Sequence, residues 1–231
     1  MPSFLMPLQQ FLALNKKKIE QAFLVVELFV VVFLLVSSFQ FFRLELPYST
    51  LYSIGRRLGQ VSVVLYLITL TPGIMQRLKI LTPVAAMIML FRRHFGVLTF
   101  LMVVTHSTFI VWLPQLATRQ FVWPMGFALM GSLALACFLP MWLTSNDYSK
   151  ELLGVWWKRL HRITYLALFF VYLHVALQSS TWRWPVLIFL GLEVISWAVA
   201  WWRLLTTRTP AVASTPPPTP PAPVQTPPVV K

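Results

Sequence analysis

Apolar residues gather in long runs along the chain, with polar and charged residues concentrated between them. The runs approach the ~20 residues that an α-helix needs to cross ~30 Å of hydrocarbon. They predict six membrane-spanning helices, at residues 22–42, 58–71, 95–113, 124–143, 160–177 and 185–205. The second is expected to end at Thr71-Pro72-Gly73, and the short apolar stretch 84–91 to lie along the membrane interface or extend the third helix. The predicted fold class is an all-α membrane protein, a six-transmembrane-helix bundle.

The composition supports a lipid bilayer as the solvent. Of the 231 residues, 58% are hydrophobic and only 11% are charged, against about 25% charged residues in a typical soluble domain. A soluble domain of this size would need a far more charged surface, so an ordinary cytoplasmic enzyme is excluded. The single cysteine, Cys137, excludes a disulfide scaffold, a cysteine zinc site, an iron–sulfur cluster held by this chain alone and a Cys-x-x-Cys-His heme attachment.

The net charge of +13 carries information about orientation. Cytoplasmic segments of membrane proteins are enriched in Lys and Arg. The basic residues do not gather on a soluble face, so nucleic acid is not an expected partner. With the N-terminus inside, 14 of the 19 Lys and Arg residues fall in cytoplasmic segments. Both termini are therefore predicted to be cytoplasmic, and the span that follows the lysines at 16–18 is interpreted as a retained anchor.

The composition also divides the chain. Residues 1–21 are predicted to form a cytoplasmic N-terminal segment, and residues 22–208 the six-helix domain. Nine of the 18 prolines fall in residues 209–231. Because such a segment cannot pack a core, we expect a disordered proline-rich tail with polyproline II character.

Four histidines carry the candidate chemistry. His94 and His106 belong to the third predicted helix, and His161 and His174 to the fifth. One span separates these helices, so both cross the membrane in the same direction. His106 lies 12 residues beyond His94, and His174 lies 13 beyond His161, about 18 and 19.5 Å at 1.5 Å per residue. The histidines therefore form two layers of matched depth, the inner pair His94 and His161 and the outer pair His106 and His174.

Two imidazoles that face each other from parallel helices suit the two axial positions of a heme iron. Two stacked hemes between the third and fifth helices would carry electrons through the bilayer. The alternative is that each histidine only hydrogen-bonds a neighbouring helix, and the matched depths favour ligation. At about 100° per residue, the two histidines of each helix lie about 120–140° apart around its axis. We therefore expect the outer pair to form a site more readily than the inner pair.

Other polar residues in or beside the spans have two interpretations each. For Glu27 and Glu193 the expected role is a protonated carboxyl that bonds to another helix, and the alternative is proton movement or a quinone pocket. A basic cytoplasmic rim is expected to reach lipid phosphates, or to bind heme propionates or a flavin phosphate. Its residues are Arg92, Arg93, Lys158, Arg159 and Arg162. The sequence contains no nucleotide-binding motif, so the reductant is expected to come from another protein or a diffusible carrier.

Segments around the histidines resemble a known family. Residues 144–148 and the run Trp157-Lys158-Arg159-Leu160-His161-Arg162, with His174 following, are similar to the ferric reductase-like transmembrane domain. Residues 55–72, and the run Arg92-Arg93-His94-Phe95-Gly96 with His106, resemble an earlier part of it. The family includes NADPH oxidases, ferric reductases and the heme-binding membrane subunit of the periplasmic methionine sulfoxide reductase system. The chain looks more like that subunit than like a complete ferric reductase.

The resemblance implies a set of heme-ligating histidines: His106, His161 and His174, with His94 as the fourth candidate. It implies one or two hemes b, and it leaves FMN open as a further cofactor. The expected function is to take electrons from a cytoplasmic flavin reductase and pass them to a periplasmic molybdenum enzyme. Arg92, Arg93 and Arg162 are the candidate residues for the charged groups of the cofactors. We therefore expect an oxidoreductase component in a bacterial inner membrane rather than a complete enzyme.

Three other functions remain open. A ferric or other metal-ion reductase component would pass electrons to an external metal ion, and a quinone is a further candidate partner. A small transporter or channel would use Glu27, Glu193 and the histidines as a polar path. A heme-free assembly partner would act through its proline-rich tail. A visible spectrum separates the heme proteins from the last two.

Overall fold

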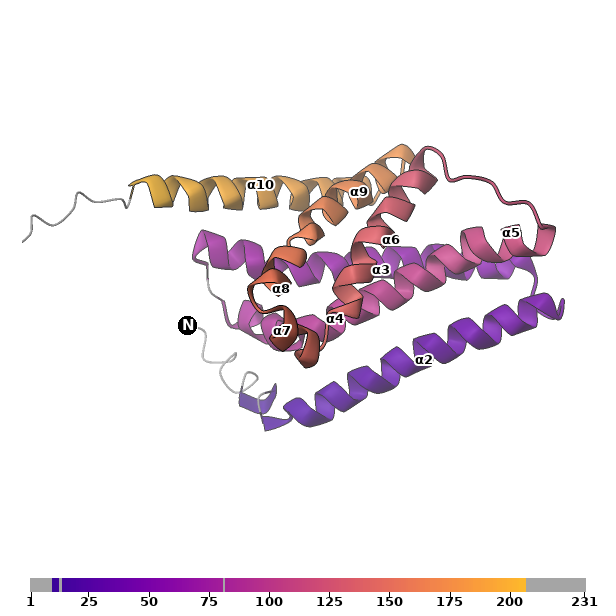
Figure 1. The fold of residues 1–231 in the computed structure, drawn as a ribbon, viewed down its shortest axis with the longest axis horizontal. Coiled ribbons are helices and arrows are strands. Elements are labelled where there is room, and N and C mark those ends of the chain that lie inside the picture. The colour runs from indigo at the N-terminus through magenta and orange to yellow at the C-terminus, as the bar shows by residue number, and fades with distance from the viewer. Residues whose placement is uncertain (1–9, 13, 81, 207–231) are drawn as a thin grey trace, which may run out of the picture.

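The computed structural model describes residues 10–12, 14–80 and 82–206, and every regular element in these ranges is helical (Figure 1). The elements are α2 (Lys16–Phe42), α3 (Tyr48–Leu78), α4 (Pro83–Ser107), the π-helix η1 (Thr108–Trp112), α5 (Leu113–Thr118), α6 (Phe127–Leu143), α7 (Asp147–Leu153), α8 (Val155–Leu160), α9 (Ile163–Leu177) and α10 (Arg183–Thr206). The predicted tail, 209–231, lies outside the described residues, as do residues 1–9 and 13 of the predicted N-terminal segment.

Within the described ranges, five helical segments are long and apolar enough to cross a membrane: Lys16–Phe42, Tyr48–Leu78, Pro83–Thr118, Val155–Leu177 and Arg183–Thr206. A sixth span results if α6 and α7, which are bent by 91° relative to each other, are counted as one. The prediction of an all-α membrane protein is therefore confirmed, with up to six spans.

The predicted limits of the second span are wrong at both ends. Helix α3 begins at Tyr48, continues through Pro72 and ends at Leu78. Proline disfavours a helix interior because it lacks an N–H, but spans tolerate it where neighbouring groups compensate, and Pro72 is buried. The helix instead stops after Leu78, because the next residue, Lys79, adopts a left-handed φ of 60°.

The apolar stretch 84–91 extends the third helix. Thr82 begins α4 by accepting a hydrogen bond from the Ala85 N–H at 3.2 Å, and Pro83 occupies the first turn. Beyond Ser107 the chain widens into the π-helix η1 and continues as α5. π-Turns inside α-helices frequently occur at functional sites. The start of η1 two residues after His106 therefore favours a functional role for this region.

The fifth predicted span is a broken helix. His161 ends α8, and α9 begins two residues later, at Ile163. His174 lies in the last turn of α9. The two histidines of this span therefore have different backbone settings, one at a break and one within a regular helix.

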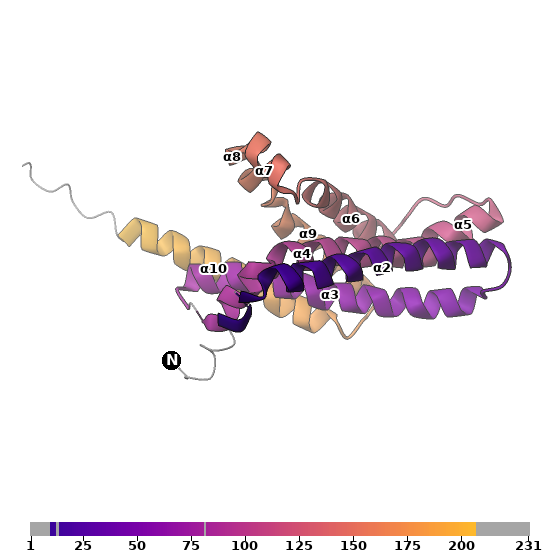
Figure 2. The same cartoon turned by 90° about the horizontal axis from the view of Figure 1, so that it is seen from below.

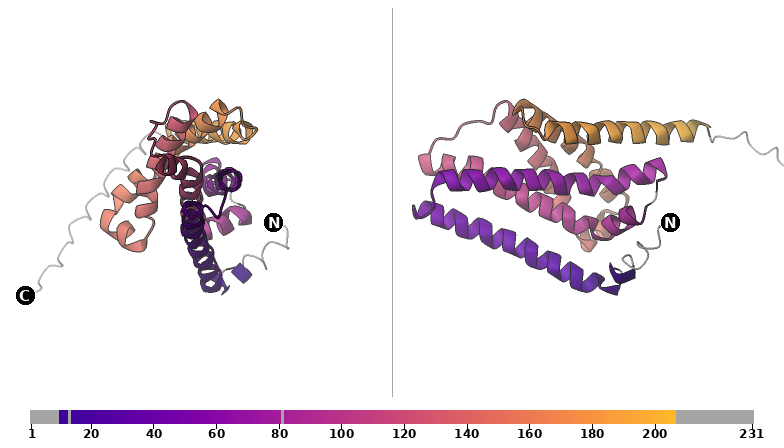
Figure 3. Two further views of the ribbon diagram at one scale, coloured as in Figure 1. Left: turned by 90° about the vertical axis from the view of Figure 1, so that its right-hand side faces the viewer. Right: turned by 180° about the vertical axis from the view of Figure 1, so that it is seen from behind.

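The helices pack in two closely associated pairs, α3 with α4 and α6 with α9. Helix α10 contacts α3 and α9, and α2 lies against α4. Figure 3 shows α2 and α10 on opposite sides of the molecule, whereas Figure 2 shows α7 and α8 projecting from the bundle.

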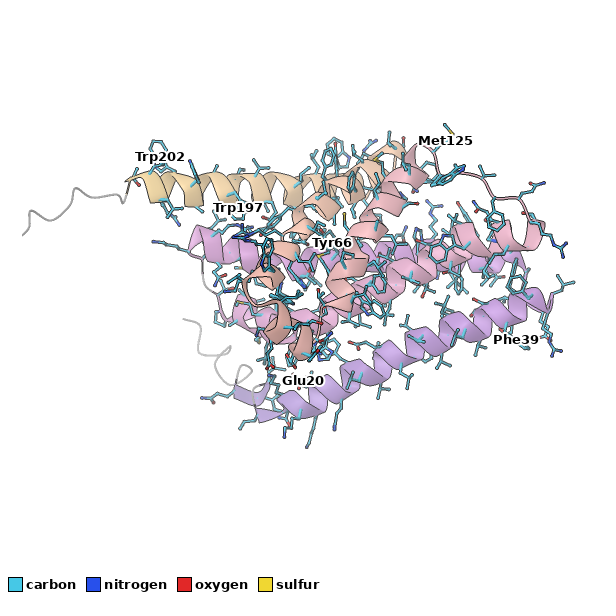
Figure 4. All side chains as sticks on the ribbon, viewed as in Figure 1. Glu20, Phe39, Tyr66, Met125, Trp197 and Trp202 are labelled. Carbon is cyan, nitrogen blue, oxygen red and sulfur yellow. The ribbon has the colours of Figure 1, made fainter. Side chains whose placement is uncertain are left out.

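A buried apolar cluster joins α3, α4, α6, α9 and α10, and it includes Tyr66, Phe100, Phe138, Leu168 and Val186. The Tyr66 hydroxyl donates a hydrogen bond to the Thr164 carbonyl and thereby satisfies its polar atom inside this cluster. Figure 4 shows Tyr66 among the helices, with Phe39 and Trp202 projecting from the outside of the bundle. The exposed apolar side chains, Phe39 and Trp202 among them, suit a hydrocarbon solvent.

Candidate functional site

The outer pair of histidines comes together between α4 and α9. The rings of His106 and His174 lie with their centroids 6.3 Å apart and their planes at 82°. His106 lies in the last turn of α4, next to η1, and His174 in the last turn of α9. The structure therefore brings together the two residues that the sequence analysis assigned to one layer.

The hydrogen bonds of the two rings fix which nitrogen carries the proton. Nδ1 of His106 lies 2.8 Å from the Gly55 carbonyl oxygen, and Nδ1 of His174 lies 2.8 Å from the Phe127 carbonyl oxygen. A carbonyl oxygen only accepts, so Nδ1 is the donor in both rings. In the neutral imidazole the lone pair is then on Nε2. Metal-binding histidines commonly donate their other ring N–H to a carbonyl or carboxylate in this way.

The Nε2 atoms of the outer pair are weakly engaged by protein. Among the described residues, none forms a hydrogen bond with Nε2 of His106, whereas Nε2 of His174 lies 3.4 Å from the Gln178 side-chain nitrogen. Two neutral imidazoles are too few for a structural zinc site, which takes four ligands. Two is the number of axial ligands that a heme iron takes. The donor set therefore fits a heme.

The inner histidines have separate partners. Nδ1 of His94 lies 2.9 Å from Oε1 of Glu27 on α2, and its ring stacks on Phe23 at 5.1 Å. The His161 ring stacks on Trp157 at 4.1 Å, and its Nε2 lies 3.1 Å from the Thr144 hydroxyl. The contacts between described residues do not join His94 to His161. Glu27 occupies only Nδ1 of His94, so Nε2 of this ring stays open to a ligand.

The three arginines proposed for cofactor charges lie on the exposed surface. Arg93 forms an ion pair with Asp147, with Nη1 and Oδ2 3.1 Å apart, and both side chains are exposed. Arg92 and Arg162 are exposed as well, Arg92 next to Arg93 on α4 and Arg162 immediately before α9. Of these three, Arg93 is therefore partly neutralised by a protein carboxylate.

Both carboxylates within the spans bond to another helix, as the sequence analysis expected, but their partners are basic side chains, and the Arg77 partner of Glu193 favours a charged carboxylate over the expected protonated one. Glu27 on α2 contacts His94 on α4, and Glu193 on α10 pairs with Arg77 on α3. The Arg77 guanidinium also donates to the Ser196 hydroxyl at 2.9 Å and to the Tyr165 hydroxyl at 3.0 Å. The sequence analysis missed this role of Arg77, which is one of the 14 cations that it placed in cytoplasmic segments.

The sequence analysis also missed the acceptors of the outer pair. Both are backbone carbonyls, of Gly55 and Phe127, and every residue carries such a group. A signal existed on α3 alone, because glycines four residues apart, such as Gly55 and Gly59, are typical of helices that approach closely. Phe127 has no comparable signature.

The chain is similar to a known family of membrane proteins. The family model described as "Ferric reductase like transmembrane component" matches residues 58–172. That range contains His94, His106 and His161 and ends two residues before His174. No solved structure matches the chain.

The chain is also similar to curated proteins of Brucella ovis, Brucella canis and Brucella suis, each described as the protein-methionine-sulfoxide reductase heme-binding subunit MsrQ. In each case the identity is 30% over 130 residues, which covers 53% of this chain and 58% of the relative. The chain thus spans less than two thirds of the length of these relatives.

Proposed function

Since the chain belongs, through residues 58–172, to the family of ferric reductase-like transmembrane components, we propose that it is a b-type heme protein that passes electrons across a membrane. The observation that carries the proposal is the outer pair, His106 and His174, whose rings lie 6.3 Å apart with both Nδ1 atoms bonded to backbone carbonyls. A heme held there would supply a one-electron redox centre.

The residues around the outer pair have defined roles in this proposal. The carbonyls of Gly55 and Phe127 hold each ring in the tautomer whose Nε2 has the lone pair. They also limit rotation of the rings, because turning either imidazole would break its hydrogen bond to the backbone of another helix. Each Nε2 is thereby held in a fixed position, where it could bind a heme iron.

We place a second heme towards the inner histidines. His161 is the proposed ligand on the resemblance of its sequence run, and His94 is its candidate partner through the Nε2 that Glu27 leaves open. Arg92, Arg93 and Arg162 are proposed to neutralise heme propionates or the phosphate of a bound FMN.

The proposed direction is from a cytoplasmic flavin reductase, through the membrane, to a periplasmic methionine sulfoxide reductase. The Brucella relatives, described as heme-binding subunits of a protein-methionine-sulfoxide reductase, support the acceptor. The cation distribution supports an orientation with both termini in the cytoplasm, and the proposed location is a bacterial inner membrane. The chain then acts as the electron-transfer component of a larger system.

The test is the visible spectrum of the protein purified in detergent. We expect a Soret band that shifts on reduction with dithionite, together with non-covalent heme that is extracted by acid acetone. A preparation that stays colourless when heme is supplied during expression would overturn the proposal.

The second candidate is the membrane component of a ferric or other metal-ion reductase, which the description of the matching family favours. Both candidates use the same hemes, so the spectrum does not separate them. The rate at which the reduced protein is reoxidised does separate them. For the first candidate, the methionine sulfoxide reductase should reoxidise it. For a metal-ion reductase component, a ferric chelate should reoxidise it at a comparable rate.

A further inference from the structure

Each ring of the outer pair rests directly on a glycine of a neighbouring helix. A Cβ atom placed on Gly59 of α3 would lie 2.8 Å from Nδ1 and 2.9 Å from Cε1 of His106. A Cβ atom on Gly131 of α6 would lie 2.8 Å from Nδ1 and 2.9 Å from Cε1 of His174. These separations are far below van der Waals contact, and the atoms involved belong to rigid rings. Any larger residue at either glycine must therefore displace the imidazole.

The two glycines occupy the same position relative to the carbonyl that the ring uses. His106 bonds the carbonyl of Gly55, four residues before Gly59, and His174 bonds that of Phe127, four residues before Gly131. A helical side chain leans towards the N-terminus and covers the preceding turn. The side chain at the fourth residue after a carbonyl therefore covers that carbonyl, and only glycine leaves it open to a ring from another helix.

Contacts of the other helical glycines separate this arrangement from ordinary helix packing. For Gly59 and Gly131 the three nearest atoms all belong to the histidine ring. For Gly55 a Cβ would instead meet Ile110 and Phe109 of η1 at 3.1 Å, which is close approach of two helices. Gly191 on α10 has nothing within 4 Å.

We propose that Gly59 and Gly131 are positioning residues. Because each glycine lacks a side chain, the imidazole of one proposed heme ligand can reach its carbonyl acceptor, with one glycine for each of the two ligands. This inference rests on the proposed function for the identity of the ligand. It adds that the ligand geometry is set from outside α4 and α9, by two glycines on α3 and α6. Displacing either ring removes its Nδ1 hydrogen bond and moves its Nε2.

The test compares Gly59→Ala and Gly131→Ala with Gly191→Ala in the full chain purified in detergent. The readouts are heme per protein, the low-spin ferric EPR signal, the heme midpoint potential and the helicity by circular dichroism. We expect Gly191→Ala to match the wild type. Each of the other two should keep its helicity and either lose at least half of its heme or show a changed EPR signal and potential.

Three results would overturn the inference. Wild-type heme content, EPR signal and potential in both Gly59→Ala and Gly131→Ala would show that the positions of the two rings do not depend on these glycines. Loss of heme together with loss of helicity in both variants would assign the glycines to helix packing. Equal heme loss in Gly191→Ala would show a general effect of alanine. Gly59 and Gly131 lie on different helices, so the test needs only one of the two variants to fold. A wild-type protein without heme would instead reject the proposed function.

Discussion

Arg77 on α3 and Glu193 on α10 form an ion pair inside the helix bundle. Glu193 is only 4% exposed, and the guanidinium is further bonded to Ser196 and Tyr165 and lies 5.0 Å from the centre of the Trp197 ring. In a low-dielectric interior such a pair is stable only when its remaining hydrogen bonds are also made. The cluster therefore connects α10 to α3, to which Arg203 of α10 also donates a hydrogen bond at the Arg77 carbonyl.

Removing one partner of this pair is expected to be costly. Glu193→Ala would leave the Arg77 charge buried and unpaired, at about 3–5 kcal/mol of stability. Thermal loss of helicity in detergent should occur at a clearly lower temperature. Glu45→Ala, at an exposed glutamate, is the matched control and should unfold like the wild type. The double variant Arg77→Met with Glu193→Leu should lose less than Glu193→Ala alone, and an unaltered melting curve for Glu193→Ala would contradict the role of the pair.

The outer histidines should depend on each other. His106→Ala and His174→Ala are each expected to lose or severely weaken the same heme, with similar difference spectra, because either change leaves the iron one strong ligand short. Gln178→Ala is the control: its amide lies near Nε2 of His174, and its removal should leave the heme in place. Full heme content with unaltered absorption and redox titration in both histidine variants would reject ligation by this pair.

The inner histidines can be tested against the outer pair in the same assay. His161→Ala is expected to lose the second heme and keep the spectrum of the outer one. We expect His94→Ala to give the same loss, because Glu27 occupies only Nδ1 of that ring. If the spectrum of His94→Ala is unchanged, His94 serves the contact between α2 and α4 alone, and the inner heme takes another ligand.

Topology has an independent test. Reporter enzymes fused after Arg208 should be active only in the form that works in the cytoplasm, because 14 of the 19 cations fall in segments predicted to be cytoplasmic. A second fusion in the segment between α5 and α6, after Arg119, should give the opposite result. Periplasmic activity of the fusion after Arg208 would reverse the proposed direction of electron flow or change the number of spans.

Much of the fold follows from the sequence because the bilayer imposes a single length and a single polarity on its helices. The apolar runs located every span that the described residues contain, although the ends were less accurate. The second span was predicted to end at Pro72, because the missing N–H of a proline often ends a helix in water. Inside a bundle, neighbouring helices compensate for that missing N–H, and α3 continues. The depths of His106 and His174 could also be read by counting residues along their helices.

The tertiary structure decided how each helix is rotated about its own axis, and therefore which polar groups meet. Rotation is set by the packing of several helices at once, so residue counting placed His94 and His161 at one depth without revealing that Glu27 and Thr144 are their neighbours. The same holds for the partnership of Arg77 with Glu193. The sequence by itself determined the spans and predicted that His106 and His174 lie at one depth. Only the folded bundle brought the backbone carbonyls of Gly55 and Phe127 to the rings of His106 and His174. Every residue carries a carbonyl, so the sequence does not show which of them will accept a hydrogen bond from another helix.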